Sequence, residues 1–560
     1  MLVLAALAAC SAGRGDGEST ATNGATTIGA STVPAAPIAA EVGPTPTGTT
    51  TAQPSASIEE ITPTTSPASN VANPTVSEAS GGQGRASGGL RYDVTEFGYQ
   101  EHEYVVEGVA TTYPPSALPS APYRTRMIVW TPTDPARFNG TTVVEWAEVS
   151  DFGRFELTVE LGYLSPLLED AGYAFALVSA EEGGVCDRDA EGLCTATSLQ
   201  GADPARYGAL EHPGDPYSYD IFSQALQAIK HPDGLAPLGE LTADTVIATG
   251  FQHVVEKLFP TGAPDPDSVT SPFGIYGPLN AYLANGADAD ARLVDGFLID
   301  AAAPLTEPAQ YRVPVLHHLD ESAIRRTPTA DTTNHVTWEV VGASHADRWS
   351  GAHIVIPSAA GRTSKLGRAD ELAARDRSDN YGQLPDGDAA VCAPGPRTGS
   401  LFPRHYTVNA ALIAVHTWIA TGIRAPAAPF IERVGPEPTD ASEKLTRDAD
   451  GNAIGGLRAP IIDVPVASYD GEACIQAGTT VSLSSQRLAA LYPTHESYVR
   501  QLLIAIDQAV DDRFLLCADA ERIMRGASAS TIGGSDEFRV GPACAAEPAP
   551  SSIPSSSTML

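Results

Sequence analysis

The sequence predicts an α/β fold, in which a mostly parallel sheet carries helices on both faces and is followed by a helical C-terminal region. Short β-branched and apolar runs alternate with helical patterns between residues 104 and 342, which is the order of elements in a parallel sheet. Several of these runs are continuously apolar, as strands buried on both faces tend to be. After residue 400 the apolar residues recur at helical spacing instead.

Eight strands are predicted, and the first two are expected to form an antiparallel edge. They cover Tyr104–Ala110, Thr125–Trp130, Thr142–Trp146, Ala174–Ala180, Thr245–Gly250, Gly296–Ala301, Val313–Leu319 and Val336–Gly342. Helical patterns between them predict helices over Leu161–Ala171, Ser218–Ile229 and Pro278–Asn285. In the C-terminal region we expect three helices. The first covers Thr407–Thr421 and would end at Gly422, the second begins after Thr494 as its N-cap, and the third covers Asp519–Arg525.

The charge of the chain restricts its partners. Among 560 residues, Lys and Arg number 34 against 68 for Asp and Glu, so the formal net charge is −34. Such an excess of carboxylates repels phosphate backbones and anionic lipid headgroups, and we therefore expect no nucleic-acid partner. No apolar run reaches the ~18 residues that a transmembrane helix needs.

The two ends of the chain differ in composition from its middle. Residues 1–10 end in Leu7-Ala8-Ala9-Cys10, which is similar to a lipoprotein signal and would place a lipid on Cys10, although the basic segment of a secretory signal is missing. Residues 11–88 are rich in Ser, Thr, Ala and Pro and predict a disordered linker. A folded body over 89–545 and a disordered tail over 546–560 complete the predicted organisation. We expect a protein of the cell envelope, exported and either lipid-anchored or secreted, with no other membrane contact.

The remaining six cysteines suggest disulfides, because an even number is typical of exported chains. Proximity in the sequence favours Cys186 with Cys194 and Cys517 with Cys544, which leaves Cys392 for Cys474. A zinc site is the weaker alternative, since the chain has no Cys-x-x-Cys pair.

Candidate catalytic residues follow two successive predicted strands. Asp320 and Glu321 come directly after Val313–Leu319, and His345 follows Val336–Gly342. Ligands of open α/β sheets bind beyond the carboxyl ends of the strands. An acid after one strand and a histidine after the next is the order of the last two members of an α/β-hydrolase triad, in which the nucleophile comes first. The alternative is that His345 is a structural histidine.

Short motifs along the body carry a family resemblance. They are Phe97–Tyr99, Ala121–Tyr123, Phe138–Thr141, Val144–Trp146, Asp203–Tyr207, His212–Asp215, Tyr219–Gln224, Val294–Leu298, Trp338–Val340 and Asp450–Gly456. Together they resemble the bacterial secreted proteins known as alpha/beta-hydrolase domain proteins, over roughly residues 95 to 525. The resemblance implies Glu321 as the acid, with Asp320 as the alternative, and His345 as the base. It also implies that Glu321→Gln would keep the fold and sharply lower any esterase rate.

The sequence departs from this family at the nucleophile. The family follows its central strand with Gly-x-Ser-Gln-Ser-Ala, whereas this chain reads Thr249-Gly250-Phe251-Gln252-His253 and returns to the family pattern at about Gly277. Residues 251–276 contain only Ser268 and Ser271 as serines. Three interpretations remain open: an insertion with Ser271 or another residue as nucleophile, a catalytically silent relative, or a local reading-frame error.

Other patterns carry weaker signals. Glu148 stands where the family has Asn, in the region expected to hold the oxyanion, and a carboxylate beside a developing oxyanion is unfavourable unless it points to solvent. Five histidines between 317 and 353 match no zinc signature. Asp448, Asp450 and Asn452 are similar to the start of a calcium loop, but Ala453 and Ala459 stand where that loop needs Gly and Glu, which favours a Gly-rich turn. No nucleotide-binding motif is present, so we expect no cofactor and no metal.

Two functions are consistent with these patterns. The first is an exported serine-hydrolase-like protein that cleaves an ester or amide, with His345 and Glu321 retained and Ser271 a poor nucleophile candidate. The second is a non-catalytic binding lipoprotein of the same fold. Either would take a small ester-like molecule, and no pattern indicates an oligomeric state.

Overall fold

The computed structural model describes residues 71–82, 86–112, 118–149, 156–251, 293–300, 311–324, 328, 330–353, 365–378, 400–434, 445–474 and 477–534. The chain divides into two units, Met1–Ser66 and Pro67–Leu560, and all of the described residues belong to the second. The predicted lipidation site Cys10, the predicted helix Pro278–Asn285 and the candidate nucleophile Ser271 lie outside the described residues.

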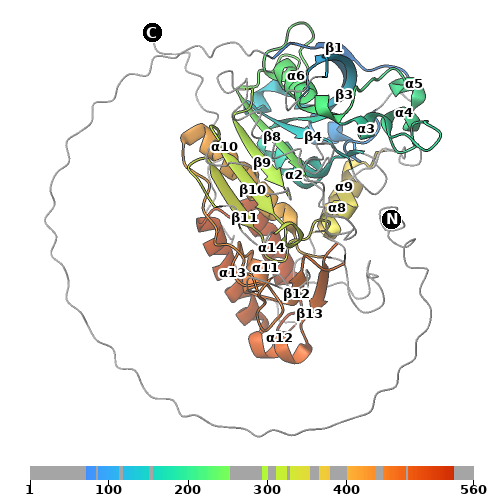
Figure 1. The fold of residues 1–560 in the computed structure, drawn as a ribbon. Coiled ribbons are helices and arrows are strands. Elements are labelled where there is room, and N and C mark those ends of the chain that lie inside the picture. The colour runs from blue at the N-terminus through green and yellow to red at the C-terminus, as the bar shows by residue number, and fades with distance from the viewer. Residues whose placement is uncertain are drawn as a thin grey trace, which may run out of the picture. The chain divides into compact units, whose positions relative to one another are not determined.

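A nine-stranded sheet forms the centre of the described part (Figure 1). Its spatial order is β1-β2-β3-β7-β4-β8-β9-β10-β11. The six strands from β7 to β11 pair in parallel, whereas β1, β2 and β3 form an antiparallel edge that joins them through β7. The strands are β1 (Thr75–Glu78), β2 (Tyr99–Ala110), β3 (Ala121–Pro132), β4 (Thr141–Trp146), β7 (Ala174–Val178), β8 (Thr245–Phe251), β9 (Gly296–Asp300), β10 (Val315–Leu319) and β11 (His335–Glu339).

Helices cover both faces of this sheet, as the sequence predicts. Alternate strand residues such as Val143 and Ile247 pack with α2 (Val159–Ala171) and α10 (Arg404–Thr421) in one apolar cluster. Their neighbours Val144 and Val246 pack with α6 (Ser218–Lys230) in a second cluster. The fold class is therefore confirmed: a mostly parallel sheet between two helical layers.

The C-terminal region is helical, and Figure 1 shows its helices in red beside β11. Thr494 caps α13 by accepting a hydrogen bond from the Ser497 N–H, and Gly422 ends α10 in the left-handed conformation, as predicted. The further elements are α3 (Glu182–Cys186), α4 (Leu199–Ala202), α5 (Pro204–Tyr207), α8 (Arg348–His353), α9 (Arg368–Ser378), α11 (Pro460–Asp463), α12 (Ser485–Leu491), α13 (His495–Asp511), α14 (Cys517–Ala529), and the short strands β5 (Glu148–Val149), β6 (Glu156–Leu157), β12 (Ala467–Asp470) and β13 (Thr479–Ser482).

One strand lies where the sequence predicts a linker. Strand β1, Thr75–Glu78, pairs antiparallel with β2 as the edge of the sheet. Its four residues Thr-Val-Ser-Glu are all at least partly exposed. Val76 packs against the second apolar cluster, and pairing with β2 holds the segment as a strand. The folded body therefore includes residues upstream of 89.

Cysteine pairing agrees with the sequence prediction where it is described. Cys186 and Cys194 form a disulfide. Cys474 and Cys517 are also disulfide-bonded, and their partners lie outside the described residues. In the described part of the chain, no helix is long and apolar enough to cross a membrane.

Candidate active site

The turns after β10 and β11 bring Asp320 and His345 together. The two strands are adjacent and parallel, so their carboxyl ends meet at the same edge of the sheet. The His345 Nδ1 lies 3.7 Å from the Asp320 Oδ2, and both side chains are almost completely buried. Two candidates that are 25 residues apart in the sequence therefore meet as the predicted strand order requires.

The Asp320 carboxylate is built into its turn. Its Oδ1 accepts hydrogen bonds from the backbone N–H of Ser322 (2.8 Å) and of Ala323 (3.1 Å), and it thereby caps a short 3₁₀ helix, Glu321–Ala323. Burial by itself would raise the pKa of this carboxyl. The interaction with His345 and the positive charge of Arg404 outweigh burial and hold the pKa well below its ordinary value. Asp320 is thus an ionised carboxylate beside an imidazole.

Glu321, which the family resemblance favours as the acid, bonds in another direction. Its Oε1 accepts from the Gly342 N–H (2.7 Å), and its Oε2 accepts from the Gly471 N–H (2.9 Å) and from Arg447 (3.0 Å). Burial raises the pKa of Glu321 to about 7, although Arg447 and the backbone donors oppose the shift. The carboxylate that the structure brings to His345 is therefore that of Asp320, the alternative candidate, while Glu321 binds two backbone N–H groups and the Arg447 guanidinium.

Gly342 shows why these turns need their glycine. It adopts a φ of +78° in the turn that leads from β11 to His345, and a Cβ at this position would lie 2.8 Å from the Tyr469 Cβ. Its N–H is the one that Glu321 accepts. Gly342 thus adopts the left-handed conformation where Tyr469 of the C-terminal segment packs closely against the turn, just before the loop that carries His345.

Buried acids also gather where α2 begins. The Glu145 carboxylate, on β4, accepts hydrogen bonds from the N–H groups of Val159 (2.8 Å), Glu160 (3.1 Å) and Leu161 (3.1 Å), and it thereby caps α2. Burial raises the pKa of Glu145 to about 8 despite these three donors. Burial, together with the charges of Asp300 and Glu145, raises the pKa of Glu160 well above its ordinary value.

Glu148 belongs to this buried group and does not point to solvent. It lies in the two-residue strand β5 and is only 5% exposed. Its charge contributes to the raised pKa of Glu160. A carboxyl group therefore stays inside the domain in the region where the sequence predicts the oxyanion.

The residues suspected of metal binding have structural contacts. Asp448 accepts from the N–H groups of Asp450 and Asn452 in a tight turn, and Asp450 forms a two-bond ion pair with Arg487. This is the Gly-rich turn that the sequence favours over a calcium loop. His318 lies 2.8 Å from the Asp300 Oδ1 through Nδ1 and 2.9 Å from the Thr407 Oγ1 through Nε2. The described residues contain no group of three or more His, Cys, Asp or Glu arranged to hold a metal ion.

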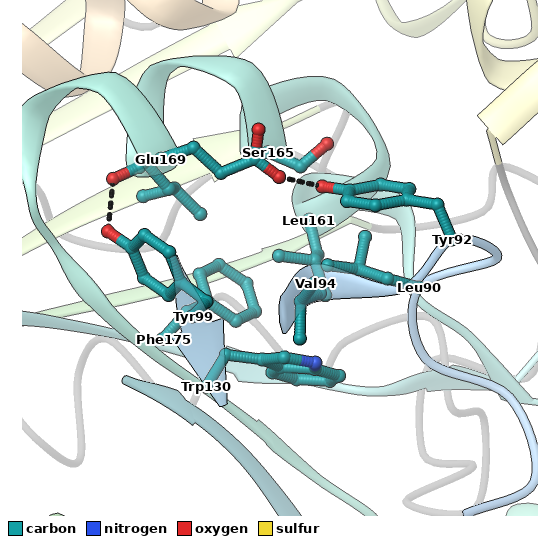
Figure 2. A pocket seen from close by; sticks show the side chains of 10 residues that line it. Leu90, Tyr92, Val94, Tyr99, Trp130, Leu161, Ser165, Glu169 and Phe175 are labelled. Atoms are coloured by element: carbon teal, nitrogen blue, oxygen red, sulfur yellow. Dashed lines mark hydrogen bonds between the residues drawn. The ribbon is translucent and has the colours of Figure 1, made fainter. Parts of the chain in front are cut away.

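A pocket lined mostly by apolar residues lies apart from Asp320 and His345 (Figure 2). The Tyr92 hydroxyl donates to Glu169, and the Tyr99 hydroxyl donates to the Leu168 carbonyl (2.6 Å). Since its walls are mostly apolar and its tyrosines bond to neighbouring protein groups, we regard it as a packing gap beside α2. Its lining residues are Leu90, Tyr92, Val94, Tyr99, Trp130, Leu161, Ser165, Leu168, Glu169 and Phe175.

Arg404 and Asp300 are the site residues that sequence reasoning missed. Arg404 is the first residue of α10 and pairs with Asp300, at the end of β9, and with Asp320. Asp300 could have been found as an acid that ends a predicted strand. Arg404 carried no comparable signal, because it follows Asp320 by more than 80 residues and starts a helix that reads as packing.

Comparison with known proteins gives a family match over most of the chain. A family described as "Alpha/beta hydrolase domain" matches residues 63–252 and 276–525. The gap between the two matched segments coincides with the stretch in which the sequence lacks the expected serine motif. A search of curated proteins found no match.

Solved structures are similar at low identity. An alpha-beta serine hydrolase homologue from Coxiella burnetii is 11% identical, with a TM-score of 0.24, over 43% of this chain and 88% of that one. The esterase Est22 is 9% identical, with a TM-score of 0.22, over 41% and 67%. Candida antarctica lipase A is 11% identical, with a TM-score of 0.19, over 39% and 41%.

Proposed function

Because this chain belongs to the alpha/beta hydrolase domain family, we propose that it cleaves an ester or amide bond of a small molecule, with His345 as general base and Asp320 as the acid that orients it. The observation that carries the proposal is the 3.7 Å approach of Asp320 Oδ2 to His345 Nδ1 at the ends of adjacent parallel strands. A carboxylate on Nδ1 favours the imidazole tautomer whose Nε2 accepts the proton of a nucleophile.

The roles of the two neighbouring acids follow from their contacts. Asp320 is ionised and faces the imidazole, whereas both oxygens of Glu321 accept hydrogen bonds from Gly342, Gly471 and Arg447. Glu321 in our proposal stabilises the turn and takes no part in proton transfer. The nucleophile stays a prediction: Ser271 and the rest of the stretch 252–292 lie outside the described residues.

A fluorophosphonate probe tests this proposal, because it reacts with an activated serine. We expect labelling of the purified protein, loss of labelling in His345→Ala and unchanged labelling in His416→Gln. His416 is a matched control, since it lies on α10 and bonds Tyr173 instead. Labelling that persists in folded His345→Ala would exclude His345 as the base.

A second candidate function is ligand binding without catalysis. The observation that favours it is the break of the family match between residues 252 and 276, where the serine motif would stand. Sequencing of the gene across codons 250–277 is the direct check. A Gly-x-Ser-Gln-Ser motif in a corrected frame would remove the support for the binding function, whereas an unchanged sequence together with no probe labelling would support it.

We also propose that the protein is exported to the cell envelope and anchored by a lipid on Cys10. The Cys186–Cys194 disulfide supports an oxidising compartment. Metabolic labelling with palmitate should mark the wild-type protein and not Cys10→Ser; equal labelling of the two would exclude the anchor.

A further inference from the structure

Arg404 connects the three chain segments that end at the candidate site. Its side chain is completely buried. One guanidinium nitrogen, Nη2, pairs with Asp300 at the end of β9. The other, Nη1, lies 3.5 Å from the Asp320 Oδ2 and donates to the carbonyl oxygens of Ser344 (3.0 Å) and His345 (3.1 Å). A single side chain therefore contacts the Asp320 carboxylate, the backbone of the His345 turn and a second carboxylate, that of Asp300.

The position of the Arg404 guanidinium is fixed by contacts through Asp300, His318 and Thr407. The Asp300 carboxylate that pairs with Arg404 also contacts the His318 Nδ1, at 2.8 Å. The His318 Nε2 lies 2.9 Å from the Thr407 hydroxyl, and this hydroxyl donates to the Arg404 carbonyl (2.8 Å). These contacts form a closed ring through β9, β10 and α10, so the arginine cannot turn away from Asp320 without breaking several of them.

Arg404 shifts the pKa values of the buried acids around it, but to different net effect. Burial alone would raise the pKa of Asp300, but Arg404 and His318 outweigh it and lower the pKa. Asp320 behaves in the same way. For Glu160 and Asp347, burial dominates and raises the pKa although Arg404 opposes it. The positive charge thus lowers the pKa of the two carboxylates that Arg404 contacts and does not offset burial at Glu160 and Asp347.

We propose that Arg404 is a positioning residue for the Asp320–His345 pair: it holds the Asp320 carboxylate by an ion pair and fixes the backbone of the turn that carries His345. This inference rests on the proposed hydrolase function for its catalytic consequence. The planar guanidinium presents several N–H donors in a rigid arrangement, so it can serve a carboxylate and two carbonyl groups at once. A lysine at this position would keep the charge and lose that arrangement.

The test compares Arg404→Lys with Arg433→Lys. Arg433 is a matched control, because it also pairs with a buried acid of the sheet, Glu339 of β11, and donates to the Ile431 carbonyl. The first readout is the tautomer of the His345 imidazole, measured by ¹⁵N–¹H NMR of histidine-labelled protein, with His345→Gln to identify the signal. The second is the rate of fluorophosphonate labelling at pH 7.

We expect wild-type His345 to carry its proton on Nδ1, facing Asp320. In Arg404→Lys that tautomer should lose its preference, and labelling should slow by roughly tenfold to a hundredfold, the size of effect expected from a small misplacement of a catalytic group. Arg433→Lys should leave both readouts unchanged. A folded Arg404→Lys protein with the wild-type tautomer ratio would overturn the proposal, whatever its labelling rate.

Two provisions keep this test decisive. If the wild-type protein is not labelled at all, the hydrolase function fails, but the tautomer comparison still decides the role of Arg404. If Arg404→Lys does not fold, the double variant Arg404→Met with Asp300→Asn replaces it. The double variant removes one positive and one negative charge together, so Asp300 is not left as a buried carboxylate without its cation, and only Asp320 loses the guanidinium. It should shift the tautomer in the same direction, and an unchanged ratio overturns the proposal.

Discussion

Two buried acidic groups near the carboxyl ends of the strands have opposite protonation behaviour. The histidine side consists of Asp320, His345 and Arg404, and the helix side consists of Glu145 and Glu160 at the start of α2. All of these acids are buried, and burial alone would raise the pKa of each carboxyl. Asp320 nevertheless has a lowered pKa, whereas burial dominates for Glu145 and Glu160.

The difference comes from the partners that surround each acid. Asp320 has a cation 3.5 Å away in Arg404 and an imidazole 3.7 Å away. Glu145 has three backbone N–H donors and its pKa still rises to about 8. The carboxylate oxygens of Glu160 have no hydrogen-bond partner among the described residues. At Glu145, hydrogen bonds from the end of a helix do not offset burial, and at Glu321 neither do Arg447 and two backbone donors. At Asp320, Arg404 and His345 together do offset it.

The largest expected effect concerns the acid that serves His345. Asp320→Asn should lower kcat on a simple acyl ester by about 10²–10⁴-fold, the size of loss seen when a triad acid becomes an amide. Glu321→Gln should lower it by less than about tenfold, because Glu321 bonds Gly342, Gly471 and Arg447 instead. This reverses the expectation drawn from the family resemblance. Steady-state kinetics of both variants decides between the acids, and an equal loss in Glu321→Gln would restore Glu321 to the site.

The next effect is a fall in stability as the pH rises. The folded-state pKa of Glu145 is raised to about 8 and that of Glu321 to about 7. A raised pKa contributes stability that is complete below the unfolded value of ~4.5 and is lost as the pH rises through the folded value. The shift of Glu321 alone corresponds to on the order of 3 kcal/mol. Urea unfolding at pH 5, 6.5 and 8 should show this decline.

Two variants show how much of the decline in unfolding free energy comes from Glu145 and how much from Glu321. Glu145→Gln and Glu321→Gln should each flatten the dependence of unfolding free energy on pH. Asp320 has the opposite sign, since its lowered pKa contributes stability above about pH 4 that is lost only as the pH falls further. A wild-type stability that is constant or rises from pH 5 to 8 would contradict the protonation difference between the two sides.

The smallest effect is expected on the helix side. Glu160→Gln should change the free energy of unfolding at pH 4.5 by less than about 1 kcal/mol. The raised pKa leaves an uncharged acid in the folded protein at this pH, the same carboxyl is also about half protonated in the unfolded chain, and an amide of the same shape replaces it. Asp300→Asn is the matched control, since it removes an ionised partner of Arg404 and should cost about 3–5 kcal/mol. Chemical denaturation measures both. A large loss in Glu160→Gln would mean that Glu160 is ionised in the folded protein.

The sequence predicted the elements that bury apolar surface. Each of the eight predicted strands corresponds to a strand of the sheet, because continuous apolar runs such as Val143–Val144 are buried on both faces and leave a clear pattern. Strand β1 was missed because it consists of four residues that are all at least partly exposed and is held by pairing with β2. Short helices such as α4 were missed for a similar reason, since four residues show no period.

For the candidate site, the sequence by itself determined that an acid after one strand and a histidine after the next would meet, because parallel strands end at one edge of the sheet. Which of Asp320 and Glu321 lies beside His345 was decided only by the tertiary structure. The two residues are adjacent and chemically alike, and what separates them is the set of partners that other segments bring: Arg404 for one, Arg447 and Gly471 for the other. The protonation of a buried carboxyl depends on its nearest charged and hydrogen-bonding partners. No local sequence pattern shows which cationic residue, distant in the chain, will pack beside it.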